Sequence, residues 1–362
     1  MVRAMVQSGP RQMEMREFPR PVIGPDDGLL RLEACGICGS DVEQYKGHLW
    51  REGARPSIPG HEPLGIIEEV GERAAARWGV EPGERVALEI IIPCHTCDLC
   101  ITGHYQACRN RRGAHGVTPI DQAPSLWGGF ADYVYLHPDS IVHKMRKDIP
   151  AETAVMFNPL GAGVRWAVEY GQTTLGDTVL VLGPGQRGIA AVIAAKVAGA
   201  GTVIVTGLSK DKNKLALAEE FGADHTINVE EENTVERVAE ITDGKMADVV
   251  LELTPMATAP VLDAIESVRH GGRVVLAGLK GGRAVELKTD RLINKAITMV
   301  GAYGVDATAY VQAIQIIESG RFPLERMHTH TFELADTVRA IETLAGEVEG
   351  EEAVHVAICP SA

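Results

Sequence analysis

The sequence has no long apolar run and no excess of positive charge. None of its hydrophobic stretches approaches the roughly eighteen consecutive apolar residues that a membrane-spanning helix needs. Its opening, MVRAMVQSGPRQMEMREF, lacks the apolar centre of a signal peptide. Its 35 basic and 49 acidic side chains give a formal net charge of −14, which repels nucleic acid and anionic lipid. We therefore expect a cytoplasmic protein that binds neither nucleic acid nor membrane.

Tandem repeats and low-complexity segments are also missing. We therefore divide the 362 residues into domains by their patterns of predicted strands and helices. Up to about residue 155, short apolar segments such as DGLLRLEACGI and ERVALEII are separated by Gly, Pro and Asp, which predicts a β-rich domain. From about residue 176, strands alternate with glycine turns and helices. This alternation indicates a parallel sheet of about six strands with crossover helices. The last segments are too few for a domain, and we expect them to pack on the first part.

A glycine-rich loop, VLVLGPGQRG, follows the first strand of the alternating region. Gly183, Gly185 and Gly188 have the G-x-G-x-x-G spacing, directly before an alanine-rich helix. Such a loop turns tightly, lets the backbone approach a pyrophosphate and places the pyrophosphate at a helix N-terminus. Gln186 and Arg187 lie within this loop. We predict a dinucleotide site here; the alternative is a plain strand-to-helix turn.

The second strand of this region, TVIVTG, ends at Gly207 without the acidic residue that usually accepts from the adenosine ribose. Ser209 and Lys210 follow and offer a donor and a positive charge, so we favour NADP over NAD. Both residues could instead be helix-capping and solvent-facing.

Four of the seven cysteines, Cys94, Cys97, Cys100 and Cys108, have the spacing C-x2-C-x2-C-x7-C. In a reducing compartment such a cluster binds metal more readily than it forms disulfides. Four thiolates close a tetrahedron around zinc without an open position, which is typical of a structural site. The chemistry must then lie elsewhere.

Cys38 in CGICGSD and His61 in PGHEPLG are a second thiolate and an imidazole, with Glu62 and Asp41 close to them in sequence. Zinc held by two or three protein ligands keeps a position for water or substrate, as catalytic sites require. Cys35 is better interpreted as a buried small residue.

These motifs together resemble a known family. GHEPLGIIEEVGERA fits the G-H-E-x2-G-x5-G-x2-A pattern of zinc-containing alcohol dehydrogenases, and CGICGSD, the cysteine cluster and VLGPGQRG occur in the expected order. From about residue 20 to its end, the chain resembles medium-chain zinc-dependent alcohol dehydrogenases, close to the sorbitol and threonine dehydrogenase branch. The resemblance implies an α/β protein: a GroES-like β-rich catalytic domain (1–156 and 307–362) and a doubly wound Rossmann coenzyme domain (157–306).

The same resemblance assigns roles to residues around the second cluster. Cys38 and His61 become ligands of a catalytic zinc, and Glu62 becomes a third ligand or a close neighbour that exchanges with water. Asp41 matches the acid that orients the histidine. Ser40 matches the hydroxyl that hydrogen-bonds the alcohol and passes on its proton.

Two positions depart from the family pattern. Asn158 stands where the family has a cysteine or an acidic residue, and because an amide oxygen is a poor zinc ligand we expect Glu62 to coordinate directly. Glu43 stands where a relay histidine is often found, and it could act as a base or simply face solvent.

The expected function is reversible hydride transfer between an alcohol, with a secondary alcohol favoured, and NAD(P)+. The expected cofactors are a catalytic zinc, a structural zinc and NAD(P), and the expected assembly is a homodimer or homotetramer. Two alternatives stay open: a zinc-independent carbonyl or alkene reductase, and a non-catalytic cofactor-binding scaffold.

Overall fold

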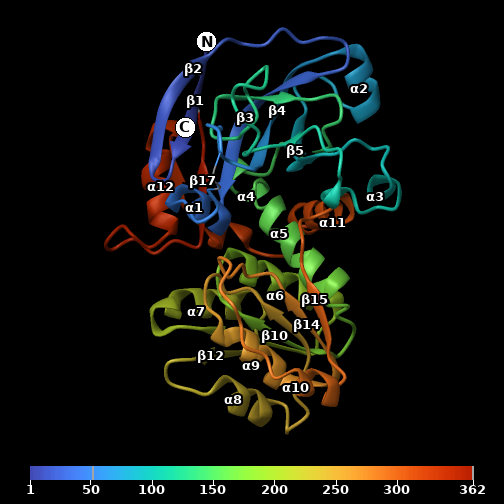
Figure 1. Ribbon diagram of the computed structural model, residues 1–362, viewed down its shortest axis with the longest axis vertical. Coiled ribbons are helices and arrows are strands. Elements are labelled where there is room, and N and C mark those ends of the chain that lie inside the picture. The colour runs from blue at the N-terminus through green and yellow to red at the C-terminus, as the bar shows by residue number, and fades with distance from the viewer. Residues whose placement is uncertain (51–52, 361–362) are drawn as a thin grey trace. The chain divides into compact units, whose positions relative to one another are not determined.

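The computed structural model describes residues 1–50 and 53–360. They form two compact units, Met1–Asn158 with Ile314–Ala362, and Pro159–Ala313 (Figure 1). The boundaries lie two and seven residues beyond those predicted at 156/157 and 306/307, and they fall within helices α5 (Phe157–Val164) and α11 (Ala307–Glu318). No helix among the described residues is long and apolar enough to cross a membrane.

The first unit is built on a mixed seven-stranded sheet in the order β16-β17-β3-β4-β5-β9, with β8 also paired to β3. Its strands are β3 (Gly28–Ile37), β4 (Glu62–Val70), β5 (Arg85–Leu88), β8 (Tyr133–Leu136), β9 (Val142–Lys144), β16 (His328–Phe332) and β17 (His355–Ile358). The C-terminal strand β17 pairs antiparallel with β3, so this last segment packs on the first part of the chain, as expected. The two ends of the chain thus share one sheet.

Smaller elements surround this sheet. Two-stranded ribbons join β1 (Val2–Gly9) to β2 (Gln12–Phe18) and β6 (Ile91–Ile92) to β7 (Gly113–Ala114). The helices are α1 (Gly39–Lys46), α2 (Glu72–Trp78), α3 (Asp98–Ile101), α4 (Ala151–Ala154) and α12 (Thr337–Leu344). Helix α12 packs on α1 and β17, and a buried cluster that includes Ile37, Val42 and Ile341 lies between them.

The second unit is a six-stranded parallel sheet in the order β12-β11-β10-β13-β14-β15. Its strands are β10 (Thr178–Leu182), β11 (Thr202–Gly207), β12 (His225–Asn228), β13 (Ala247–Glu252), β14 (Val268–Leu276) and β15 (Thr298–Gly301). Its helices are α6 (Gln186–Ala198), α7 (Lys212–Glu220), α8 (Thr234–Ile241), α9 (Ala259–Ser267) and α10 (Thr289–Asn294). The six strands predicted from the alternating pattern are confirmed.

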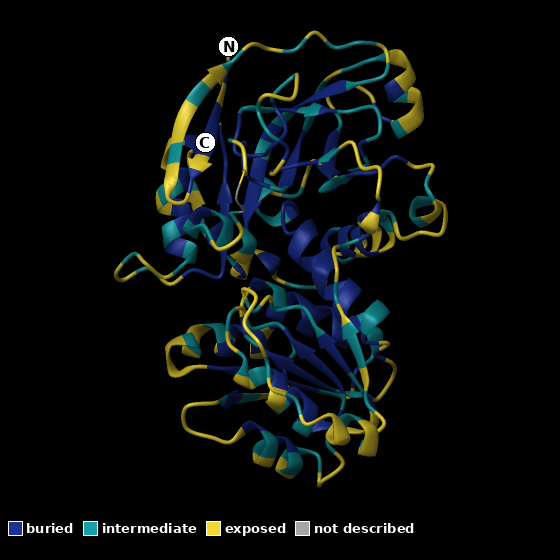
Figure 2. Cartoon of the chain, viewed as in Figure 1, coloured by how far each residue is buried: buried dark blue, intermediate teal, exposed yellow. Residues whose placement is uncertain are grey.

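This strand order reverses between β10 and β13, as in a doubly wound dinucleotide fold, and ligands of such sheets bind at the carboxyl ends of the strands near that reversal. The central strands are buried (Figure 2), because β-branched and leucine side chains of β10, β11 and β13 fill the core on both faces of the sheet.

Candidate functional site

The end of β3 and the start of β4 bring the second cluster together. Cys38 directly follows β3 and caps the N-terminus of α1, while Glu62 is the first residue of β4. The antiparallel register places Glu62 opposite Gly36, two residues before Cys38. His61 lies immediately before the same strand. Cys38 therefore meets His61 and Glu62, which lie more than twenty positions later in sequence, at one end of the sheet.

The ligand atoms of Cys38, His61 and Glu62 all lie within 4.8 Å of one another. The sulfur of Cys38 is 3.3 Å from His61 Nε2, and His61 Nε2 is 3.9 Å from Glu62 Oε1. One thiol, one imidazole and one carboxylate are ordinary zinc ligands, and they number one fewer than a tetrahedron takes. The donor set and its spacing fit a zinc ion with an open position.

Asp41 supports this cluster from the first turn of α1. Its Oδ2 accepts from the backbone N–H of Cys38 at 2.9 Å, and its Oδ1 lies 3.2 Å from His61 Nδ1. Burial lowers the pKa of His61, but the charges of Asp41 and Cys38 outweigh burial and raise that pKa well above its usual value. Asp41 and Cys38 thus place negative charge around His61.

Gly36 is a site residue that sequence reasoning missed. A Cβ built on Gly36 would lie 2.5 Å from Glu62 Oε2, so any side chain there would displace the carboxylate. Glu62 itself is fully buried. The first glycine of CGICGSD is the available sequence signal, but its partner could be found only from the register of β3 and β4.

The remaining expected residues of this site are placed as follows. Ser40 Oγ lies 2.9 Å from Cys38 Sγ and 3.3 Å from His61 Nε2, beside two of the three ligand atoms. The Glu43 carboxylate instead contacts Nδ1 of the exposed His48 at 2.5 Å, near the C-terminus of α1. Asn158 is buried in the first turn of α5.

The four-cysteine cluster has the dimensions of a closed zinc site. Four of its sulfur–sulfur separations lie between 3.5 and 3.9 Å, and a tetrahedron with Zn–S bonds of about 2.3 Å has edges of about 3.8 Å. All seven cysteines of the chain are free thiols, so the cluster holds no disulfide. Cys35 is fully buried, as expected.

Hydrogen bonds prepare two of these thiols for metal binding. The backbone N–H and the hydroxyl of Thr96 lower the pKa of Cys94 to about 6. The backbone of Cys100 lowers the pKa of Cys97. The thiolate is the form that binds metal, so these contacts favour occupation.

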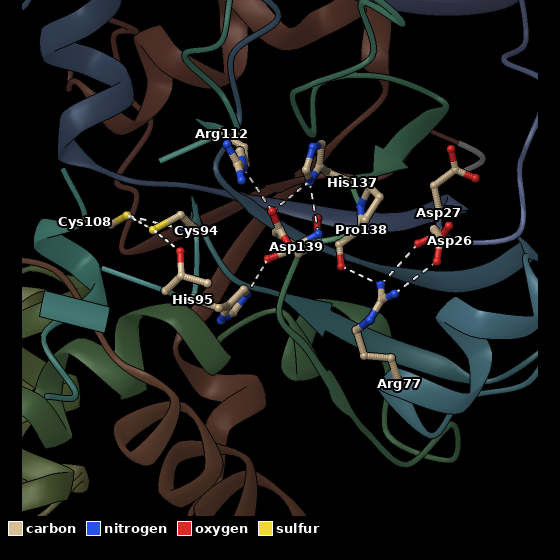
Figure 3. A network of polar contacts seen from close by, with 12 residues as sticks. Asp26, Asp27, Arg77, Cys94, His95, Cys108, Arg112, His137, Pro138 and Asp139 are labelled. Atoms are coloured by element: carbon tan, nitrogen blue, oxygen red, sulfur yellow. Dashed lines mark hydrogen bonds and ion pairs between the residues drawn. The ribbon is translucent and has the colours of Figure 1, made fainter. Parts of the chain in front are cut away.

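The cysteine loop is also tied to the neighbouring segment at Asp139 (Figure 3). His95 Nε2 contacts the backbone oxygen of Asp139 at 3.0 Å, and Arg112 Nε donates to its carboxylate at 3.2 Å. From within the loop, Tyr105 donates to the buried Glu89 at 2.6 Å. His95 is thus an exposed loop residue with a structural contact, outside the sulfur cluster.

The glycine loop joins β10 to α6 in the second unit. Gly183 has a φ of 111°, which favours glycine, and a Cβ on Gly188 would lie 2.0 Å from the Gly183 carbonyl oxygen. Gly185 caps α6, and a Cβ there would meet no atom within 4 Å. The first and third glycines therefore fit the turn and the packing, and open space above the second fits a pyrophosphate. Gln186 and Arg187 form the first turn of α6, and the Arg187 guanidinium stacks over Trp166.

The turn after β11 carries a contact that sequence reasoning also missed. Gly207 ends the strand, and Ser209 and Lys210 follow as exposed residues. The backbone N–H of Ser209 donates to Glu230 Oε2 at 2.8 Å. Glu230 lies in EEEN, which reads from sequence as a solvated charged turn, and only the pairing of β11 with β12 brings it here.

Two family models match the chain. The alcohol dehydrogenase GroES-like domain matches residues 24–147, and the zinc-binding dehydrogenase model matches residues 188–319. The protein named Probable alcohol dehydrogenase adh from Mycobacterium tuberculosis is 44% identical over 364 residues, covering 99% of this chain and 98% of that protein.

Two solved structures carry coenzymes. A zinc-binding dehydrogenase from Sinorhizobium meliloti 1021 bound to NADP has a TM-score of 0.86 and 26% identity, with 99% of both chains covered. An alcohol dehydrogenase from Escherichia coli complexed with NADH has a TM-score of 0.84 and 26% identity, again with 99% of both chains covered. One of these two neighbours thus holds NADP and the other NADH.

Proposed function

Because the chain belongs to the medium-chain zinc-dependent alcohol dehydrogenases, we propose that Cys38, His61 and Glu62 hold the catalytic zinc of an NAD(P)-linked enzyme that interconverts alcohols and carbonyl compounds. The observation that carries this assignment is the buried three-ligand cluster, whose ligand atoms lie within 4.8 Å of one another. A zinc-independent reductase would have no use for that arrangement. A non-catalytic scaffold would have no use for an open coordination position.

Zinc in such a site lowers the pKa of a bound hydroxyl, as it lowers that of water from 15.7 to about 7. The chain's own residues prepare the site for this. Asp41 holds the proton on His61 Nδ1, which leaves Nε2 as the metal-binding nitrogen. Ser40, within 3.3 Å of His61 Nε2, would hydrogen-bond the substrate hydroxyl and relay its proton to solvent, releasing its own hydroxyl proton as it accepts that of the substrate. A bound nicotinamide coenzyme would supply the hydride acceptor.

The four cysteines Cys94, Cys97, Cys100 and Cys108 hold a second, structural zinc in this proposal. Their sulfur atoms supply a complete tetrahedron, so a substrate could bind there only by displacing a ligand. Contacts with Asp139 and Glu89 connect the loop to the β-sheet unit, which suits a role in shape rather than in chemistry.

For the coenzyme, we propose binding of the pyrophosphate at Gly183, Gly185 and Gly188, with Gln186 and Arg187 at the N-terminus of α6. Ser209 and Lys210 are the sequence basis for preferring NADP, and Glu230 is the structural observation that opposes it. Four further points stay predictions: a secondary alcohol as substrate, a homodimeric or homotetrameric assembly, a cytoplasmic location, and a role for Asn158 or Glu43 in turnover.

The test is zinc content measured together with turnover. Wild-type protein should hold two zinc ions per chain by elemental analysis and oxidise alcohols with NAD+ or NADP+. Cys38→Ser should lose one zinc and turnover while still binding coenzyme. Cys97→Ser is the matched control, because it removes a cysteine sulfur from the four-cysteine cluster instead. This variant should lower the melting temperature before it affects turnover. Substantial turnover by Cys38→Ser, or by protein with a single chelator-resistant zinc, would refute the catalytic assignment.

A further inference from the structure

The turn after β12, the strand next to β11, supplies a carboxylate that the end of β11 lacks. β11 and β12 run parallel, with Gly207 opposite Asn228. Two residues beyond this pair, Ser209 and Glu230 face each other, and the Ser209 N–H donates to Glu230 Oε2 at 2.8 Å. Because parallel strands end at the same edge of a sheet, the carboxylate lies at the edge where a dinucleotide's adenosine half binds.

A small network fixes the position of this carboxylate. Asn228 Nδ2 donates to Ser209 Oγ at 2.9 Å, and the backbone N–H of Glu230 donates to Asn228 Oδ1 at 3.2 Å. The hydrogen bond from Ser209 lowers the pKa of Glu230, with a smaller contribution from the charge of Lys210. Glu230 is therefore ionised at neutral pH and held at the turn.

The same network changes the electrostatics of the turn. Lys210 contributes positive charge close to Glu230, so the carboxylate offsets the lysine that favours a phosphate. Lys214 lies 3.4 Å from Asp211, which offsets a second cation of the same segment. The Ser209 N–H, a donor that an anion would use, is already bound to Glu230.

We propose that Glu230 selects the coenzyme: it accepts hydrogen bonds from the adenosine ribose hydroxyls of NAD and excludes the 2′-phosphate of NADP. This inference rests on the proposed coenzyme function and replaces the preference for NADP drawn from Ser209 and Lys210. The acidic residue that usually ends the second strand comes here from the turn after the third strand.

The test measures binding of NAD+ and NADP+ to the purified full chain by isothermal titration calorimetry, which needs no turnover. Wild-type protein should bind NAD+ more tightly. Glu230→Gln keeps the shape and removes the charge, so it should shift the NADP+/NAD+ affinity ratio toward NADP+ by about tenfold, as expected when one charge near a partly screened phosphate is removed. The shift should shrink at high salt.

Glu231→Gln is the matched control, because it removes the same charge one residue later from another exposed side chain. A shift in Glu230→Gln together with an unchanged ratio in Glu231→Gln would support the proposal. Three results would overturn the proposal that Glu230 selects the coenzyme: tighter binding of NADP+ than of NAD+ by wild type, an affinity ratio in Glu230→Gln within twofold of wild type, or an equal shift in both variants. Each of these results would leave the dehydrogenase function standing. If neither coenzyme bound, the proposed function itself would fail.

Discussion

Replacing Asp41 by Asn should weaken the catalytic zinc site and spare the structural one. The carboxylate makes two contacts, with the Cys38 N–H at 2.9 Å and with His61 Nδ1 at 3.2 Å. An asparagine amide has the same shape but only one accepting oxygen. Whichever way it turns, its NH2 group faces either the N–H of Cys38 or Nδ1 of His61. If it faces His61, the proton of the imidazole moves to Nε2 and blocks the metal-binding nitrogen.

The size of this effect follows from the burial of the contact. Asp41 is 2% exposed, so the lost interaction is a desolvated, charge-assisted hydrogen bond. Such a bond contributes about 1.5 to 3 kcal/mol, and about 1.4 kcal/mol corresponds to tenfold in affinity. We therefore expect zinc affinity to fall by about 10- to 100-fold, the range typical of residues that orient a metal ligand.

Competition with a fluorescent zinc chelator measures both sites in one titration. One tightly bound zinc should remain in Asp41→Asn, and the second should leave at lower chelator concentration than in wild type. Asp139→Asn is the control, since its carboxylate contacts Arg112 beside the cysteine loop and not the cluster at Cys38. An Asp41→Asn protein whose labile zinc binds within twofold of wild type would show that Asp41 does not position His61.

Three further predictions concern proton transfer, the glycine loop and acid stability. Ser40→Ala should keep both zinc ions but lower kcat by about 100-fold or more, the usual contribution of a proton-transferring group; an unchanged kcat would exclude this role. Gly188→Ala should lower the melting temperature, because its Cβ would lie 2.0 Å from a backbone oxygen, whereas Gly185→Ala should melt like wild type and bind coenzyme poorly, and equal melting of the two variants would contradict this. Burial, with a smaller effect of His328, lowers the pKa of His355 to about 3. The unfolded chain therefore gains a proton below about pH 6.5 that the folded chain does not, and stability falls by about 2 kcal/mol at pH 5. The free energy of unfolding can be measured by urea titration at pH 7.5 and at pH 5. Between these two pH values His355→Leu should lose about 2 kcal/mol less stability than wild type. Equal losses in the two proteins would show that His355 does not cause the acid sensitivity.

The parts of the molecule that could be predicted from sequence are those encoded by local spacing. The alternation of apolar runs with glycine turns and helices predicts the six-stranded parallel sheet, because each strand and helix carries its own pattern. The four cysteines from Cys94 to Cys108 come together for the same reason, since fifteen consecutive residues hold all of them. A short loop can gather its own ligands without help from the rest of the fold.

The contacts that could not be predicted all depend on strand register. Gly36 faces Glu62 because β3 and β4 pair with that alignment, and Glu230 faces Ser209 because β12 pairs with β11. A shift of one residue would turn each of these side chains to the other side of the sheet. Register is decided by tertiary packing. The sequence, with no acid at the end of β11, therefore favours NADP, although the folded chain brings Glu230 there from the turn after β12.

Ligand charge accounts for the different uses proposed for the two candidate zinc clusters. Four thiolates outweigh the two charges of zinc and fill its tetrahedron, so the cysteine loop neither attracts nor admits another anion. At the other cluster, in the proposed assignment, Cys38 and Glu62 would together balance the charge of the ion, a neutral His61 would be the third ligand, and one position would stay open. Replacing Glu62 by Asn158 as the ligand would leave a net positive site beside a fully buried carboxylate. Burying that charge costs less when the cation binds directly to it, so the charges favour Glu62 as the third ligand.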